Sequence, residues 1–273
     1  MKNLIIILIV SIMNWGCGHN KSFFYQKSRS VKSSIDYIQI KNDSIFDSNQ
    51  IISLLTINKK DINNFNVKFG HNSPNLNTTS ILAESNNAIA AINGGFFDIN
   101  NGQNTTYFEI NNTIINRKKI SKKKSMLDIL MNGAIVIKYG SEIIIQHAKS
   151  EQFYESSKQE SAVLISCPLL LIDSKALELP HVSFVDNRHP RTCLCNTKDS
   201  TIFITIDGRS MGAEGMSLSE AQSFLLSLGC INAINLDGGG STTMWIKDKG
   251  VVSYPSDKNG ERPVSNALLI VNK

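Results

Sequence analysis

The chain has 273 residues, of which 41% are hydrophobic and 19% are charged. This balance excludes a disordered chain, and the length is ample for a full hydrophobic core in one large domain or two small ones. The formal net charge is +5, and its densest basic stretch, residues 117–124, contains no aromatic residue. A solvated loop or hairpin explains that stretch better than a nucleic-acid footprint, so no nucleic-acid partner is expected.

The first seventeen residues predict an export signal. A short basic start precedes an apolar run over residues 4–13, which is too short to span a bilayer as a helix. The Gly16-Cys17 pair that follows is similar to a bacterial lipoprotein processing site, where the cysteine becomes lipidated. We therefore expect a signal peptide over 1–17, a polar tether over 18–34, and an exported protein of the cell envelope anchored through Cys17. A plain secretory signal, with Cys17 incidental, is the alternative.

The later cysteines do not predict a metal site. Cys193 and Cys195 are two residues apart in a predicted strand and would share a face, and no matching Cys/His pair lies nearby. With Cys167 and Cys230, they are consistent with buried free thiols or with one disulfide. The sequence does not select a pairing.

Short apolar runs predict a β-rich domain from residue 35 onward. The predicted strands are 35–40, 51–57, 88–92, 107–110, 114–115, 134–138, 142–146, 162–172 with a break at Pro168, a strand with Cys193 and Cys195, 201–206, 233–236, 244–246, 251–253 and 267–271. The Asn-rich stretch 58–77 is predicted as loops and 80–87 as a short helix. A second helix begins at Ser217, because Glu220 completes a capping box, and it ends at Gly229. The fold class expected is α+β: a mixed β-sheet core with flanking helices in a single catalytic domain over 35–273.

Three predicted loops have the same composition. Residues 93–98, 207–209 and 237–242 each follow an apolar strand and combine glycine with aspartate or asparagine. Glycine lets the main chain approach a ligand closely, and polar residues at strand ends often form binding sites. One such loop predicts only a turn, but three predict a site.

Arginine and carboxylate residues accompany these loops. Arg188, Arg191 and Arg209 lie near one another in sequence, and their planar forks suit a phosphate or a carboxylate, although surface ion pairs are the alternative use. The carboxylates are Asp98, Asp207, Glu214 and Asp237. Glycoside hydrolysis usually needs two carboxylates, but a phosphate leaving group needs less protonation, so one well-placed carboxylate can suffice.

Five ordered motifs resemble the phosphodiester glycosidases over roughly residue 88 to the end. The motifs are Asn93-Gly94-Gly95-Phe96-Phe97, Pro190-Arg191-Thr192, Asp207-Gly208-Arg209, Asn232-Ala233-Ile234-Asn235-Leu236-Asp237-Gly238-Gly239-Gly240-Ser241 and Arg262-Pro263-Val264-Ser265. Ser253-Tyr254-Pro255-Ser256-Asp257 is similar as well. The resemblance implies hydrolysis of a sugar-1-phosphodiester, such as an N-acetylglucosamine-1-phosphodiester, to free sugar and phosphomonoester.

On this resemblance we assign expected roles to individual positions. Asp237 or Glu214 would act as base or nucleophile, and Asp207 would orient an arginine or a sugar hydroxyl. Arg191 and Arg209 would hold the phosphodiester, and the N–H groups of the glycine-rich loop would stabilise an oxyanion. The expected substrate-binding residues are Asn93, Asp98, His189, Arg191, Arg209, Gly238, Gly239, Gly240, Ser241, Thr242 and Arg262.

Two other functions fit the same residues. One is a non-catalytic lipoprotein that binds an anionic glycan through its arginines. The other is a metal-dependent phosphodiesterase that breaks the P–O bond. The sequence requires no cofactor, leaves a divalent cation open, and predicts a carbohydrate phosphodiester as the partner; it does not predict an oligomeric state.

Overall fold

The computed structural model of the chain describes residues 26–27, 34–118 and 129–273. The predicted signal peptide, Cys17, most of the predicted tether and residues 119–124 of the basic stretch lie outside these residues. Two residues of the predicted tether form strand β1. Within the described parts, no helix has both the length and the apolar composition needed to cross a bilayer.

The largest sheet contains eight strands and provides two of the three site loops. In spatial order the strands are β1 (Gln26–Lys27), β2 (Ile35–Ile45), β3 (Ser48–Asn58), β14 (Ser200–Ile206), β13 (Arg191–Asn196), β15 (Asn232–Asn235), β11 (Leu169–Ile172) and β12 (Lys175–Ala176). Arg191 pairs with Ile206, and Cys193 pairs with Asn235. This register brings the start of β13 and the ends of its neighbours β14 and β15 to the same end of the sheet.

Two five-stranded sheets complete the fold. One has the order β7 (Thr113–Asn116), β6 (Phe108–Ile110), β10 (Glu160–Ser166), β8 (Gly133–Lys138) and β9 (Ile143–His147); the other has the order β17 (Gly250–Val251), β16 (Met244–Ile246), β5 (Ala88–Asn93), β18 (Asn266–Asn272) and β4 (Phe65–His71). In the second sheet β5 lies between β16 and β18. The third site loop follows β5.

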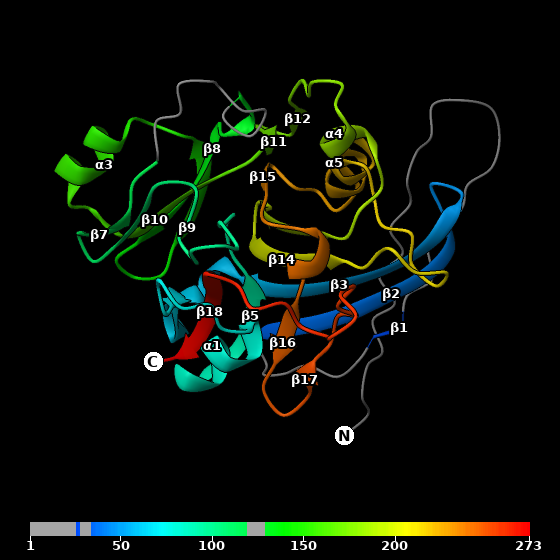
Figure 1. Cartoon of the computed structure of the whole chain (residues 1–273), viewed down its shortest axis with the longest axis horizontal. Helices are drawn as coiled ribbons and strands as arrows, with labels where there is room; N and C mark the ends of the chain where they lie inside the picture. The colour runs from blue at the N-terminus through cyan, green and yellow to red at the C-terminus, as the bar shows by residue number, and fades with distance from the viewer. Residues whose placement is uncertain (1–25, 28–33, 119–128) are drawn as a thin grey trace.

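All three sheets share one apolar core, to which Phe203 of β14, Ile92 of β5 and Ile135 of β8 contribute buried side chains. Among the described residues, short helices cover the outer faces: α5 (Leu218–Ser227) and α4 (Ser183–Asp186) on the large sheet, α1 (Thr79–Ser85) on β5 and β18, and α3 (Glu151–Ser157) on β8 and β10. Figure 1 shows α4 and α5 above β14, and α1 below β5 and β18.

The structure supports the α+β class only in broad terms. Every strand pairing among the described residues is antiparallel, so the predicted mixed sheet is wrong. Neighbouring strands run in opposite directions even where a long stretch of chain separates them, as for β5 and β18. The predicted capping box is confirmed: Ser217 Oγ accepts from Glu220 N–H at 3.2 Å, and Glu220 Oε2 accepts from Ser217 N–H at 2.9 Å.

The predicted loop over 58–77 is also wrong in part. It contains the 3₁₀-helix η1 (Lys59–Asn64) and strand β4. Phe65, Val67 and Phe69 alternate along β4 and are buried in the common core, while asparagine and lysine occupy the positions between them. The alternation of apolar residues therefore decides the local structure despite the high asparagine content.

Both alternatives for the cysteines occur together. Cys195 and Cys230 form a disulfide with a Cα–Cα distance of 5.8 Å, and Cys167 and Cys193 are buried free thiols. Cys193 and Cys195 share the sheet face that α5 covers, as their spacing predicts. The disulfide ties β13 to the turn that precedes its neighbour β15.

Candidate active site

Asn93, the last residue of β5, links the first predicted loop to the glycine-rich loop and to β13. Its buried side chain donates from Nδ2 to the Asp237 carbonyl at 2.6 Å. Its Oδ1 accepts from Thr192 Oγ1 at 2.7 Å and from Thr243 N–H at 3.1 Å. The amide thus fixes the main chain at both ends of the glycine-rich loop, which makes Asn93 a positioning residue.

The glycine-rich loop packs directly on Pro190. Gly239 N–H donates to the Pro190 carbonyl at 2.9 Å, and a Cβ atom on Gly238 would lie 2.7 Å from the same oxygen. Gly239 has a φ of +60°, and a Cβ there would lie 2.9 Å from Arg209 Nη2. The guanidinium group of Arg209 therefore lies over the loop. Ser241 and Thr242, at the end of the loop, are buried.

Asp237 begins this loop and is partly buried. Burial raises the pKa of its carboxyl to about 6, while the Ser241 side chain, Arg262 and the Gly238 N–H favour the charged form. At neutral pH the carboxylate is mostly ionised, as a base or nucleophile must be.

Asp207 lies at the end of β14 and is 1% exposed. Its Oδ1 accepts from Tyr254 N–H at 3.0 Å, and its Oδ2 has no hydrogen-bond partner in the described part of the chain. Burial raises the pKa of this carboxyl to about 7, although the Tyr254 N–H and Lys41 both favour ionisation. Asp207 thus anchors the segment that contains Tyr254.

Replacing Asp207 with asparagine is expected to change how stability depends on pH. The pKa is about 7 in the folded state and about 4 in an unfolded chain, so the folded protein binds more protons between these values. The contribution of Asp207 to the free energy of unfolding therefore falls as the pH rises from about 4 to about 7. Thermal unfolding of wild type and Asp207→Asn at several pH values should show the variant gaining relative stability as the pH rises. A constant difference would contradict this.

Arg191 is 1% exposed and holds main chain rather than facing solvent. Its Nε donates to the Met216 carbonyl at 2.9 Å, and its Nη2 donates to the carbonyls of Phe184 and Asn187 at 2.8 and 3.0 Å. Burial lowers the pKa of its guanidinium to about 10. Among the described residues, only Nη1 of Arg191 has no hydrogen-bond partner. A bidentate contact between Arg191 and phosphate, which the sequence suggested, therefore does not fit this placement.

Arg191→Lys is therefore expected to reduce stability. A lysine retains the charge but cannot reach three carbonyls at once, so buried acceptors lose their donors. We expect the free energy of unfolding to fall by about 2 kcal/mol, measured by chemical denaturation. The matched change at the exposed Arg209, Arg209→Lys, should alter it by less than about 0.5 kcal/mol. Equal effects at the two positions would contradict the buried role of Arg191.

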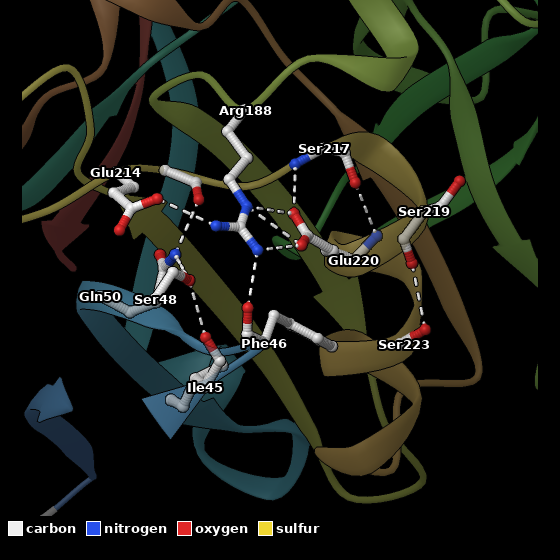
Figure 2. A network of polar contacts seen from close by, with 11 residues as sticks. Ile45, Phe46, Ser48, Gln50, Arg188, Glu214, Ser217, Ser219, Glu220 and Ser223 are labelled. Atoms are coloured by element: carbon white, nitrogen blue, oxygen red, sulfur yellow. Dashed lines mark hydrogen bonds and ion pairs between the residues drawn. The ribbon is translucent and has the colours of Figure 1, made fainter. Parts of the chain in front are cut away.

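Glu214 belongs to a second polar network, which Figure 2 shows. Arg188 donates from Nη1 to Glu214 Oε2 at 2.9 Å, from Nη2 to Glu220 Oε1 at 2.6 Å, and from Nη2 to the Phe46 carbonyl at 2.7 Å. No hydrogen bond or ion pair joins Glu214 to the glycine-rich loop among the described residues. The structure thus places Glu214 in an ion pair with Arg188, and its expected role as base stays a prediction.

Arg262 reaches the glycine-rich loop together with a carboxylate that the sequence analysis did not assign. Its Nε and Nη2 donate to Asp257 Oδ2 and Oδ1 at 2.7 and 3.0 Å. A Cβ atom on Gly240 would lie 2.1 Å from Asp257 Oδ1 and 2.2 Å from Arg262 Nη2. The ion pair therefore packs against Gly240.

A sequence model of the phosphodiester glycosidase family matches residues 86–271. The chain belongs to the phosphodiester glycosidase family. The resemblance expected from the five motifs is therefore confirmed, and the matched range contains every site residue discussed above.

Curated relatives extend beyond this chain. The chain is 33% identical over 112 residues to the SPbeta prophage-derived uncharacterized protein YomE of Bacillus subtilis. That alignment covers 34% of this chain and 17% of YomE. The chain is 27% identical over 192 residues to human N-acetylglucosamine-1-phosphodiester alpha-N-acetylglucosaminidase. That alignment covers 66% of this chain and 36% of the human enzyme. The alignments thus span about a third or less of these relatives.

Solved structures share the fold. The catalytic domain of zebrafish N-acetylglucosamine-1-phosphodiester alpha-N-acetylglucosaminidase, auto-inhibited by its pro-peptide, matches with a TM-score of 0.68 and 19% identity, covering 93% of this chain and 89% of that one. A hypothetical protein from Synechocystis matches with a TM-score of 0.61 and 14% identity, over 88% of this chain and 62% of that one.

His189 and Asp98 are the two remaining residues expected at the site of this phosphodiester glycosidase. Burial lowers the pKa of the His189 imidazole, and Arg191 and Arg209 lower it further, so all three favour its neutral form. Asp98 caps a turn: its Oδ1 accepts from Asn100 N–H at 2.9 Å and its Oδ2 from Asn101 Nδ2 at 2.9 Å. The carboxylate of Asp98 thus stabilises a local turn, and its expected contact with the substrate stays a prediction.

The residues missed by the sequence analysis are Asp257 and Tyr254, which contact Arg262 and Asp207. Both lie in the Ser253–Asp257 string that resembles the family, and that string was the available signal. Over residues 34–118 and 129–273, no group of three or more His, Cys, Asp or Glu side chains is arranged to hold a metal ion.

Proposed function

We propose that this phosphodiester glycosidase hydrolyses a sugar-1-phosphodiester to a free sugar and a phosphomonoester. One observation carries the proposal: the loop that begins with the carboxylate of Asp237 has the guanidinium of Arg209 over its Gly239. A carboxylate and a phosphate-binding group within one short loop suit a bond between an anomeric carbon and a phosphate oxygen.

In this reaction the bond between the anomeric carbon and the phosphate oxygen breaks, and its electron pair leaves with the phosphate. Arg209 and Arg262 compensate the charge on the leaving group, which reduces the need for a general acid. Asp237 either attacks the anomeric carbon or removes a proton from the attacking water. The water oxygen ends on the sugar in both cases.

Hydrolysis in heavy-oxygen water tests the proposal. An N-acetylglucosamine-1-phosphodiester is the first substrate to try, because the human relative's name specifies that sugar. We expect the label in the sugar. Label in the phosphomonoester would overturn the proposal and favour a phosphodiesterase, and loss of activity in EDTA would then implicate a divalent cation. Binding without turnover would instead favour the glycan-binding lipoprotein.

We further propose that the enzyme is exported and anchored to the cell envelope through a lipidated Cys17. The basic start, the short apolar run and the Gly16-Cys17 pair support this placement. Cys17→Ser should move the protein from the membrane fraction to the soluble fraction. An unchanged distribution would contradict the anchor.

A further inference from the structure

Tyr254 is an exposed aromatic residue in a segment that is otherwise held firmly. Its side chain is 54% exposed. Its own N–H is fixed on Asp207 Oδ1, and the preceding Ser253 Oγ accepts from Met244 N–H at 2.9 Å. The ring is thus presented to solvent from a rigid main chain.

Strand β2 holds this segment from a second direction. Gln39 Nε2 donates to the Val252 carbonyl at 2.9 Å. Lys41 Nζ donates to Tyr254 Oη at 3.4 Å and lies 5.5 Å from the centre of the tyrosine ring. An aromatic face and an ammonium group are therefore paired in a preorganised arrangement, which reduces the entropy lost when a ligand binds.

The pair is linked to the proposed phosphate site through Asp207 and Asp257. Asp207, which holds the Tyr254 N–H, is two residues before Arg209. Asp257, three residues after Tyr254, packs on Gly240 with Arg262. Tyr254 is thus connected to both groups that would bind phosphate, and it reaches them from the side of Asp207 rather than through Asp237.

We propose that Tyr254 and Lys41 form a subsite for a sugar ring on the far side of the phosphate, in the leaving group of the substrate. The proposal rests on the proposed hydrolysis. The flat ring of Tyr254 packs against the C–H face of a pyranose, and the Lys41 ammonium donates to ring hydroxyls. Binding energy from this remote part of the substrate is available to favour one leaving group over another.

Two substrates with the same N-acetylglucosamine-1-phosphate part test the subsite. One carries a methyl leaving group and the other a glucosyl leaving group. Wild type is expected to show a higher kcat/KM for the glucosyl ester. Tyr254→Ala should lower the ratio of the two kcat/KM values about tenfold, whereas Tyr254→Phe retains the aromatic face and should keep the ratio.

Tyr139→Ala is the matched control, because Tyr139 is 58% exposed in the turn between β8 and β9. It should leave the ratio unchanged. The subsite is overturned if wild type hydrolyses both esters with the same kcat/KM. It is also overturned if Tyr254→Ala keeps the ratio of the two kcat/KM values, for example by lowering both equally. Failure of wild type to hydrolyse either ester would instead sink the proposed function, and the subsite with it. Thermal unfolding of each variant separates misfolding from lost recognition.

Discussion

Asp237→Asn is expected to lower kcat/KM for a sugar-1-phosphodiester by about a thousandfold or more. Asparagine has nearly the same shape but can neither attack the anomeric carbon nor remove a proton from water. Steady-state rates of sugar release give the measurement. Asp199→Asn, in the exposed turn before β14, provides a carboxylate control and should retain full activity.

The same variant is expected to stay folded at neutral and alkaline pH. Burial raises the pKa of Asp237 to about 6, so its contribution to the free energy of unfolding falls as the pH rises from about 4 to about 6, and the full loss is present above that value. Removing the charge should leave the unfolding temperature at pH 8 equal to or above that of wild type. Lost activity with retained stability would then point to chemistry, and full activity in the variant would remove Asp237 from the mechanism.

The pH profile of wild type indicates which form of Asp237 is active. A base or nucleophile must be ionised, so kcat/KM should rise as the pH passes about 6. Asp207, with a pKa of about 7, adds a second ionisation in the same range. A profile that falls from pH 5 to pH 7 would instead make Asp237 a general acid.

The positions of the site loops could be predicted because each follows a buried strand. Apolar runs end at Asn93, Asp207 and Asp237, and the structure brings these three strand ends to one place. Their convergence depends on sheet order, which local periodicity does not contain. The family resemblance implied that these loops contribute to one site, but it did not predict the order of the strands.

The hydrogen-bond and ion-pair partners of the long side chains could not be predicted. Two of the carbonyls that Arg191 binds, those of Phe184 and Asn187, come from the short helix just before it and its C-terminal cap, but the third, that of Met216, comes from a loop 25 residues further along the chain. Glu214 similarly forms an ion pair with Arg188, which lies 26 residues earlier in the chain. A residue type indicates what a side chain can bind, but only the fold determines which partner reaches it first.

Gly240→Ala is expected to reduce kcat/KM about a hundredfold with little loss of stability. The new Cβ atom would lie 2.1 Å from Asp257 Oδ1 and 2.2 Å from Arg262 Nη2, so the ion pair must leave the loop. Both atoms are ends of flexible, partly exposed side chains, and such pairs contribute about 1 kcal/mol or less to stability. We expect activity to fall because Arg262 would be displaced from the proposed phosphate site.

Gly238→Ala is the contrasting variant. Its Cβ atom would lie 2.7 Å from the Pro190 carbonyl, which is main chain and cannot swing aside, so both stability and activity should fall. Arg262→Ala separates the remaining explanations for Gly240→Ala. If the alanine acts by expelling Arg262, the double variant should be scarcely less active than either single variant, since the two changes remove the same contact. Additive losses would mean that Gly240→Ala distorts the loop itself.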